Sequence, residues 1–345
     1  MIAASSRSDQ PQGSLETLPR RPWQQLLADA IKDPAELCRA LDLDLDILAG
    51  AHPAIRQFPL RVPRSFVAKM RRGDPHDPLL RQVLPIADEL KVVEGFGLDP
   101  VGDLASKATQ GLLHKYAGRA LLVTTGACAV HCRYCFRRHF PYADESASSD
   151  GWQGALNHLR ADTSVTEIIL SGGDPLSMSD RRLTQLSDGI QSISHLRRLR
   201  IHTRYPIVLP ERIDAEFLAW LADIRLQKVV VIHANHPREI DAATRRACSD
   251  LRAAGATVLN QSVLLAGVND DCDTLAELSE ALFACGVLPY YLHVLDAVQG
   301  AAHFDVPEPA ALALHRELAA RMPGYLVPKL VREIPGAASK TPVTA

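Results

Sequence analysis

The feature that most constrains this 345-residue chain is a cluster of three cysteines. Cys128, Cys132 and Cys135 lie on one short stretch, and an apolar, strand-like run (residues 120–124) leads directly into it. Three thiolates on one loop can hold three corners of a [4Fe–4S] cluster, which leaves the fourth iron open to a small molecule. Closed electron-transfer clusters commonly use four cysteines, so this spacing favours a catalytic cluster.

Two other interpretations of the cysteines are open on spacing alone. His139 extends the pattern to four candidate zinc ligands, although zinc modules usually supply their ligands as two separated pairs. A zinc-held interaction module without catalysis is therefore the alternative from another functional class. Disulfides are disfavoured, because three cysteines do not pair among themselves and nothing in the sequence suggests secretion.

Composition excludes several functional classes. The net charge of −2 provides no basic field for nucleic acid, and no apolar run approaches the length of a membrane span. The first residues, Met1-Ile-Ala-Ala-Ser-Ser-Arg, lack the hydrophobic core of a signal peptide. With clustered reduced thiols, these features predict a cytoplasmic protein that binds neither nucleic acid nor a membrane.

From about residue 118 the chain alternates between apolar strand-like runs and helical stretches, which predicts a parallel α/β sheet. The polar residues of interest fall at the carboxyl ends of the expected strands, where parallel barrels carry their chemistry. The pattern alone does not separate a barrel from a doubly wound sheet. The expected strands are 120–124, 167–170, 198–202, 229–234, 257–263 and 290–294, and the expected helices include 183–193, 214–224, 240–254, 275–285 and 309–321.

The sequence divides into four expected segments. Residues 1–20 are expected to form a disordered polar tail, and residues 21–105 a helical N-terminal extension. Residues 106–325 carry the strand–helix repeats, and residues 326–345 form a short C-terminal segment. Within the extension, residues 74–85 are expected to be a loop without obvious chemistry.

The cysteine spacing, with Tyr134 just before the last cysteine, resembles the signature of radical S-adenosylmethionine (SAM) enzymes. This resemblance implies a partial (β/α)6 barrel, with the cluster after the first strand and SAM chelating the open iron. The stretch after the second expected strand, residues 171–174, is similar to the Gly-Gly-Glu-type motif that contacts the SAM amino group; its plain structural alternative is a glycine turn. By motif or by position, the expected SAM contacts are Ser171, Gly172, Gly173, Asp174, His233 and Gln261.

The C-terminal residues resemble the lysine 2,3-aminomutase family, through Tyr-Leu-Val-Pro at 325–328 and Ser-Lys-Thr-Pro at 339–342. The resemblance spans about residues 55–343 and implies that Lys340 holds pyridoxal phosphate (PLP) as a Schiff base. Without it, a lysine so near a chain end would be interpreted as solvated. Lys115 and Arg119 stand where family members bind the PLP phosphate, with Lys115 in place of a more usual arginine.

The same resemblance bears on the substrate. Arg137 matches the arginine that binds the substrate carboxylate, and Asp296 and Glu333 match two aspartates that hold the distal ammonium of lysine. Two like charges in one closed site favour a cationic substrate, so L-lysine is expected. Glu333 departs from the family aspartate. A 2,3-aminomutase acting on arginine or ornithine is the enzymatic alternative.

The short form of the chain, with residues 72–81 and 339–342, resembles the bacterial branch that supplies β-lysine for modifying translation elongation factor P. This implies a pathway link to the modifying ligase and a flavodoxin- or ferredoxin-like electron donor. Cys272 matches a zinc ligand of longer members whose C-terminal partners are not in this sequence, so no zinc is expected. The remaining cysteines, Cys38, Cys248 and Cys285, are expected to be buried.

Overall fold

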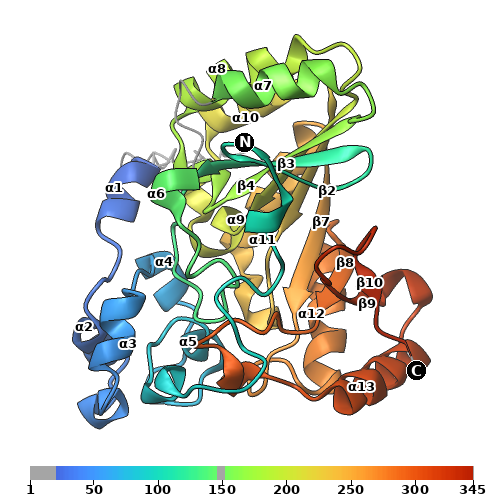
Figure 1. Ribbon diagram of the computed structural model, residues 1–345. Coiled ribbons are helices and arrows are strands. Elements are labelled where there is room, and N and C mark those ends of the chain that lie inside the picture. The colour runs from blue at the N-terminus through green and yellow to red at the C-terminus, as the bar shows by residue number, and fades with distance from the viewer. Residues whose placement is uncertain (1–20, 146–151, 345) are drawn as a thin grey trace, which may run out of the picture.

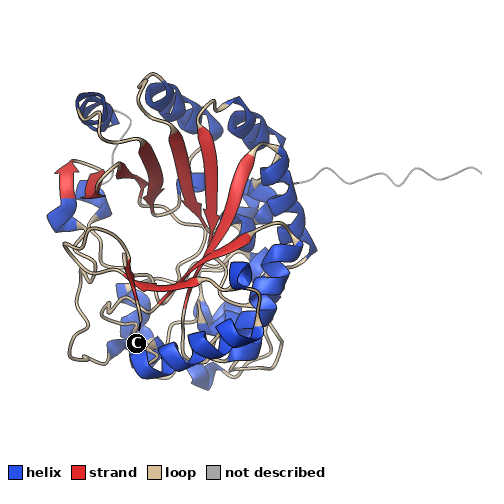
Figure 2. Ribbon diagram, turned by 90° about the vertical axis from the view of Figure 1, so that its right-hand side faces the viewer, coloured by secondary structure: helices blue, strands red, loops and turns tan. Residues whose placement is uncertain are grey.

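A computed structural model describes residues 21–145 and 152–344, which form one curved sheet with helices on its outer side (Figures 1 and 2). The expected polar tail, residues 1–20, lies outside the described residues. The ten strands lie side by side in chain order, so β1 and β10 are the edges and the sheet stays open. They are β1 (Lys107–Thr109), β2 (Leu112–Tyr116), β3 (Arg119–Thr125), β4 (Glu167–Gly172), β5 (Arg198–Thr203), β6 (Gln227–Ile232), β7 (Ala256–Val263), β8 (Leu288–His293), β9 (Lys329–Arg332) and β10 (Thr341–Pro342).

Neighbouring strands from β3 to β8 run parallel, and each of the six is followed by a helix on the outer side. The expected partial (β/α)6 barrel is therefore confirmed. The longer helices are α7 (Trp152–Ala161), α8 (Asp180–Gln191), α10 (Ala215–Asp223), α11 (Ala242–Ala253), α12 (Cys272–Ala284) and α13 (Glu308–Arg321). The short helical segments of the barrel are α6 (Tyr142–Glu145), α9 (Tyr205–Val208), η4 (Pro175–Ser177), η5 (Pro210–Arg212), η6 (Pro237–Glu239), η7 (Ala302–Phe304) and η8 (Gly324–Leu326).

Aspartates mark where three of the outer helices begin. Asp214, Asp241 and Asp271 each accept a hydrogen bond from a backbone N–H in the first turn of α10, α11 and α12. Such caps satisfy amide groups that have no partner inside the helix and stabilise it by about 1 kcal/mol each. They fix the point at which the chain turns from the mouth of the barrel back along its outside.

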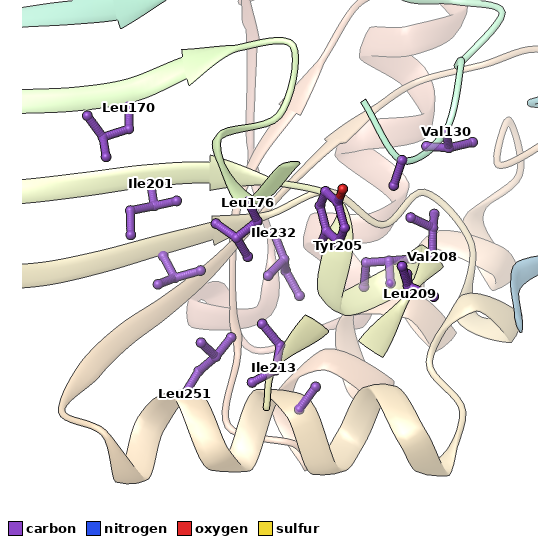
Figure 3. Close-up of a cluster of buried hydrophobic side chains, with 14 of the residues drawn as sticks. Val130, Leu170, Leu176, Ile201, Tyr205, Val208, Leu209, Ile213, Ile232 and Leu251 are labelled. Carbon is purple, nitrogen blue, oxygen red and sulfur yellow. The ribbon is translucent and has the colours of Figure 1, made fainter. Parts of the chain in front are cut away.

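The two faces of the strands differ in burial, as β5 illustrates. Leu199 and Ile201 are buried on the outer face, whereas Arg200 and His202 alternate with them and line the inner cavity. The outer faces pack against the helices in one large apolar core (Figure 3). Apolar burial thus stabilises the outside of the barrel and leaves polar side chains on the inside.

The N-terminal extension is helical, as expected, and lies beside the barrel in the blue and light-blue part of Figure 1. Its elements are α1 (Trp23–Ala28), α2 (Pro34–Ala40), η1 (Leu45–Leu48), α3 (His52–Gln57), α4 (Arg64–Val67), α5 (Pro78–Arg81), η2 (Ala87–Leu90) and η3 (Leu104–Ser106). The expectation of a loop without chemistry at residues 74–85 is wrong. This stretch contains α5, which Asp77 caps, and Gln82 is fully buried among polar partners described below.

Four strands were not anticipated from the sequence. The short hairpin of β1 and β2 precedes the parallel strands, and β9 and β10 add a parallel and then an antiparallel strand after them. The C-terminal residues 341–342 thereby lie on the same sheet as β3, the strand that leads into the cysteine loop. Cys38, Cys248 and Cys285 are buried, as expected. Within residues 21–145 and 152–344, no helix combines the length and apolar character needed to cross a membrane.

Candidate active site

Every residue predicted for the site lines a single cavity of about 400 Å³ inside the sheet. Its wall combines the cysteine loop after β3, the glycine turn after β4 and inward side chains of β5, β7 and β8. Residues far apart in the sequence, such as Lys115 and Lys340, therefore share one chamber.

The cysteine loop is joined to the glycine turn by backbone hydrogen bonds. Gly173 N–H donates to the Thr125 carbonyl at 2.7 Å, and Asp174 N–H donates to the Ala127 carbonyl at 2.8 Å. A Cβ at Gly173 would collide with the Ala127 carbonyl, and a Cβ at Gly172 would lie 2.7 Å from the Thr125 carbonyl. These glycines are thus required by the close contact of two loops, and not only by the approach of a ligand.

The N-terminal extension holds the other side of the cysteine loop. His131 Nδ1 lies 2.7 Å from the Pro59 carbonyl, and Arg133 Nη1 donates to the Phe58 carbonyl at 2.6 Å. The buried Glu89 carboxylate accepts from Arg133 Nη2 at 2.5 Å and from Arg138 Nη2 at 2.6 Å. Such buried charge-assisted hydrogen bonds fix geometry strongly, so the loop is held in shape before any metal binds.

The cysteines do not have the geometry of a single-ion zinc site. Only His114, His158 and Asp162, outside the cavity, have ligand atoms that all lie within 4.8 Å of one another in the described part of the chain. His139 is also turned away, with Nε2 at 3.1 Å from the Gln299 carbonyl. Three cysteine sulfurs spread over one cavity wall suit a multi-iron cluster, in which each sulfur binds a different iron.

Five alternating charges run along the cavity from Lys340 to Arg137. Lys340 Nζ donates to Glu333 Oε2 at 2.7 Å, and Glu333 Oε1 accepts from Lys115 Nζ at 2.9 Å. Lys115 Nζ lies 2.6 Å from Asp103 Oδ1, and Asp103 Oδ2 accepts from Arg137 Nε at 2.6 Å. We call this set, Lys340–Glu333–Lys115–Asp103–Arg137, the charge ladder.

The charge ladder determines the ionisation of its acids. Burial acts to raise the pKa of Glu333, but Lys340 and Lys115 outweigh it and lower that pKa to about 2. Burial likewise opposes ionisation of Asp103, yet Arg137 and Lys115 hold its pKa below the usual range. Both acids are therefore ionised at neutral pH, and each compensates two cations.

Asp296 differs from the acids of the charge ladder. Its carboxylate lines the cavity and has no hydrogen-bond partner among the residues described. Burial raises its pKa to about 7, although Lys340 acts in the opposite direction. A partly buried carboxyl group without a hydrogen-bond partner indicates a site for a cationic ligand, because such a group is costly unless it is paired.

Three histidines around the cavity also lack partners. The Nε2 atoms of His202, His233 and His293 are buried and have no hydrogen-bond partner in the described structure. Burial lowers the pKa of His233 to about 3 and holds the pKa values of His202 and His293 well below the ordinary value, so all three rings are neutral. Neutral imidazole nitrogens that face one chamber indicate a polar ligand there.

The residues expected near SAM surround the same chamber. Ser171 Oγ accepts from Arg137 Nη1 at 3.1 Å, and Gln261 projects from the inner face of β7 beside Val263. The Asp174 carboxylate already accepts from Thr203 Oγ1 at 2.8 Å and from Arg204 N–H at 2.7 Å. Asp174 thus links the glycine turn to the end of β5, in addition to facing the cavity.

At the end of the cavity that contains Lys340, aromatic rings lie beside the lysine. The Tyr290 and Tyr291 rings lie with centroids 3.8 Å apart and planes tilted by 35°, and Lys340 Nζ is 5.9 Å from the Tyr291 centroid. Arg119 stacks over the Tyr116 ring at 4.5 Å. This part of the cavity offers aromatic surface, a lysine and two further basic side chains, which is a donor set that fits an aromatic phosphate ester.

Several residues of the site were not anticipated from the sequence. Asp103 and Glu89 lie in segments without a periodic pattern, and Gln82 lies in the stretch interpreted as a plain loop. His293 ends β8 only three residues before Asp296, and its place at a strand end was the one signal that could have identified it.

Comparison with known proteins gives close relatives. L-lysine 2,3-aminomutase of Escherichia coli (strain K12) is 51% identical over 332 residues, covering 96% of this chain and 96% of that protein. The enzymes of that name from Haemophilus influenzae and Clostridium subterminale are 48% and 33% identical, and cover 92% and 93% of this chain and 94% and 77% of their own lengths. No family model matches the chain.

Among solved structures the similarity is weaker. A radical SAM methyltransferase from Sphaerobacter thermophilus has a TM-score of 0.46 and 18% identity, covering 64% of this chain and 68% of that chain. Coproporphyrinogen III oxidase from Escherichia coli has a TM-score of 0.40 and 13% identity, covering 67% of this chain and 57% of that chain. The sequence relatives are the stronger guide to this cavity.

Proposed function

The chain belongs to the L-lysine 2,3-aminomutase family of isomerases, and from that membership we propose that it converts L-lysine to β-lysine. The observation that carries the proposal is the pair of acids beside Lys340. Glu333 contacts Lys340 directly, and Asp296 faces the same space without a partner. A substrate with a second ammonium group would give Asp296 the cation that it lacks.

Enzymes of this family use a [4Fe–4S] cluster, SAM and PLP, and the cavity has groups that suit all three. When bound, these cofactors supply a carbon radical made by one-electron cleavage of SAM and an aromatic ring that supports migration of an amino group. In this proposal Cys128, Cys132 and Cys135 hold the cluster. The remaining chemistry of the protein is binding, orientation and exclusion of water.

Lys340 is the proposed attachment point of PLP. Its ammonium is held by Glu333 and lies beside the Tyr291 ring, so the amine is positioned where a flat ring can lie. Lys115 and Arg119 are the proposed phosphate ligands, and both line the same wall. For Lys115 to bind phosphate, the anion has to replace Asp103 or Glu333 as its partner.

Arg137 and Asp296 are the proposed ends of the substrate site, with Glu333 beside Asp296. Arg137 carries two donors toward the cavity side, one on Asp103 and one on Ser171 Oγ. A guanidinium fork suits a planar carboxylate, and it can take one by exchanging Ser171 for the substrate. Asp296 and Glu333 then orient the distal ammonium, so that the Cα–Cβ bond is held between the two ends.

The glycine turn and the two inner polar residues are the proposed SAM site. Ser171, Gly172, Gly173 and Asp174 pack directly on the cysteine loop, so a ligand there lies next to the cluster position. His233 and Gln261 face the same chamber from β6 and β7, and the unpartnered His233 Nε2 can accept a hydrogen bond.

The physiological setting is a further part of the proposal. Resemblance of residues 72–81 and 339–342 to the bacterial branch that serves translation elongation factor P supports a role in supplying β-lysine for a lysine of that factor, with a pathway link to the modifying ligase. A flavodoxin- or ferredoxin-like protein would supply the electron, and the cytoplasm would keep the thiols reduced.

Anaerobic turnover tests the proposal directly. The cluster-loaded protein is incubated with L-lysine, SAM, PLP and dithionite, and the amino acids are resolved by chromatography. β-Lysine is the expected product. A brown, SAM-cleaving protein that leaves lysine untouched but isomerises ornithine or arginine would overturn the substrate. A colourless protein holding zinc would overturn the enzyme and favour the interaction module.

A further inference from the structure

Arg204 makes a contact that none of the roles above requires. It follows β5, and its guanidinium Nη1 lies 2.8 Å from Cys132 Sγ. The side chain is only 5% exposed, and its Nη2 donates to Gln82 Oε1 at 2.6 Å and to Glu239 Oε2 at 3.2 Å. A buried guanidinium therefore donates directly to a sulfur that the proposed function assigns to the cluster.

The position of Arg204 is determined from every side. Its backbone N–H donates to Asp174 Oδ2 at 2.7 Å, so the glycine turn holds the backbone of Arg204 in place. The guanidinium lies 5.3 Å from the Phe66 ring centroid and 5.6 Å from the Tyr134 centroid. Since two aromatic rings lie against the guanidinium and both of its terminal nitrogens are engaged, the contact with Cys132 does not depend on a freely rotating side chain.

The acceptors of Arg204 are themselves held in place. Glu239 Oε1 accepts from Gln82 Nε2 at 3.0 Å and from Asn235 N–H at 3.0 Å, and Asn235 Nδ2 donates to Gln82 Oε1 at 3.0 Å. The charge of Glu239 is therefore held at Nη2 of the guanidinium, whereas Cys132 contacts Nη1. The sulfur faces the positive end of a fixed, buried ion pair.

Hydrogen bonds to cluster sulfurs and the net charge nearby are among the quantities that set the reduction potential of an iron–sulfur cluster. We propose that Arg204, through its contact with Cys132, raises the reduction potential of the cluster and so makes electron uptake easier. The inference rests on the proposed function, because it requires the cluster. Arg204 acts through Cys132, so it is a positioning residue and not a catalytic one.

The electron balance is simple. The external reductant loses one electron, and the cluster passes from the 2+ to the 1+ level while Arg204 keeps its proton and its charge. The added negative charge is shared by the irons and sulfurs, so an N–H donor on a sulfur stabilises the reduced level more than the oxidised one. Removing the donor should lower the midpoint potential.

Potentiometric titration of the reconstituted, SAM-free protein tests this, with the reduced cluster followed by electron paramagnetic resonance. Arg204→Met, which keeps the apolar stem and removes charge and donors, should need a potential at least about 59 mV lower to reach the same ratio of reduced to oxidised cluster, equal to a tenfold change in that ratio. Arg204→Lys should shift it less, because one ammonium keeps the charge but not the planar fork.

Glu239→Gln is the matched variant of opposite sign. It removes the counter-charge of Arg204 and keeps an oxygen for the backbone donors, so the midpoint should rise. A general loosening of this buried network would instead shift the midpoint potentials of Arg204→Met and Glu239→Gln in the same direction. Circular dichroism and an iron content of about four per chain, the number in one [4Fe–4S] cluster, establish that each variant is folded and loaded.

Each outcome decides the inference. Opposite shifts for Arg204→Met and Glu239→Gln support it. An unchanged midpoint in loaded Arg204→Met, or equal shifts of the same sign, overturns it and leaves the proposed function intact. Should Arg204→Met fail to retain iron, the other two variants decide: the inference requires a lower midpoint potential in Arg204→Lys and a higher one in Glu239→Gln. Wild-type protein that takes up no cluster overturns both the inference and the proposed function.

Discussion

Lys340 Nζ lies 2.7 Å from Glu333 Oε2, and the other oxygen of the same carboxylate lies 2.9 Å from Lys115 Nζ. One acid thus joins the two lysines that are proposed to hold opposite ends of PLP. The two cations neutralise the charge of Glu333. In the proposed function, PLP bound to both lysines would leave this carboxylate free to hold the ammonium of a substrate.

Lys340→Ala should abolish the PLP absorbance band and lower kcat/KM by more than about a thousandfold, a loss of ~4 kcal/mol in transition-state stabilisation. Absorbance after gel filtration and product chromatography measure the two effects. Lys329→Ala is the matched control, because Lys329 is exposed on β9 of the same C-terminal segment. A normal band with normal turnover in Lys340→Ala would show that another residue holds the cofactor.

Glu333→Gln should raise KM for L-lysine by ~10–100-fold at saturating PLP, since a charge-assisted hydrogen bond contributes about 1.5–3 kcal/mol. Glu333→Asp keeps the charge on a shorter side chain and should raise KM less. Steady-state kinetics with both variants separates charge from reach. Equal KM values in Glu333→Gln and wild type would remove Glu333 from the substrate site.

Asp103→Asn should destabilise the cofactor-free protein by about 3 kcal/mol, because it leaves Lys115 and Arg137 short of a buried counter-charge. Urea unfolding measures the change. Asp99→Asn is the control: Asp99 is exposed, and its two oxygens accept from Asp103 N–H and Leu104 N–H, of which asparagine keeps one acceptor, so a loss of no more than about 1 kcal/mol is expected. Similar stabilities for the two variants would mean that Asp103 is not essential to the charge ladder.

The sequence anticipated the barrel and the motif residues but not the groups that connect them. The six parallel strands are apolar and evenly spaced, so their pattern is strong, whereas β1, β9 and β10 have only two to four residues each and carry no periodic signal. Asp103 contacts Arg137 across 34 positions, and Gln82 contacts Arg204 across 122. Such partners are chosen by three-dimensional packing, and a single buried polar residue in an irregular segment does not reveal its partner.

Asp296 should make the stability of the cofactor-free protein depend on pH. Burial raises its folded-state pKa to about 7, above the ordinary aspartate value, so the folded state favours the protonated form. The associated stability is complete at low pH and is lost as pH rises through about 7. The Asp296→Asn variant has no ionisable group at this position, so it lacks this pH-dependent contribution to the free energy of unfolding.

Denaturant unfolding at several pH values measures the effect. From pH 4 to pH 8, wild type should lose roughly 2–4 kcal/mol relative to Asp296→Asn. Asp174, whose pKa burial raises to about 6, is present in both proteins and cancels in the comparison. Parallel pH profiles for the two proteins would show that Asp296 ionises normally in the folded state.

Gly173→Ala should separate the cysteine loop from the glycine turn. The new Cβ would collide with the Ala127 carbonyl and lie 2.8 Å from the Gly126 carbonyl carbon, and neither backbone atom can rotate away as a side chain can. The hydrogen bonds from Gly173 N–H and Asp174 N–H to the cysteine loop would be strained or lost, at about 1 kcal/mol each. Because Cys128 directly follows Ala127, the first sulfur should move out of position, and the reconstituted protein should hold less iron and cleave less SAM.

Gly324→Ala is the control, since a Cβ there meets no atom within 4 Å, and it should load iron like wild type. Full iron content in Gly173→Ala would mean that the contact between these loops does not position the cysteines.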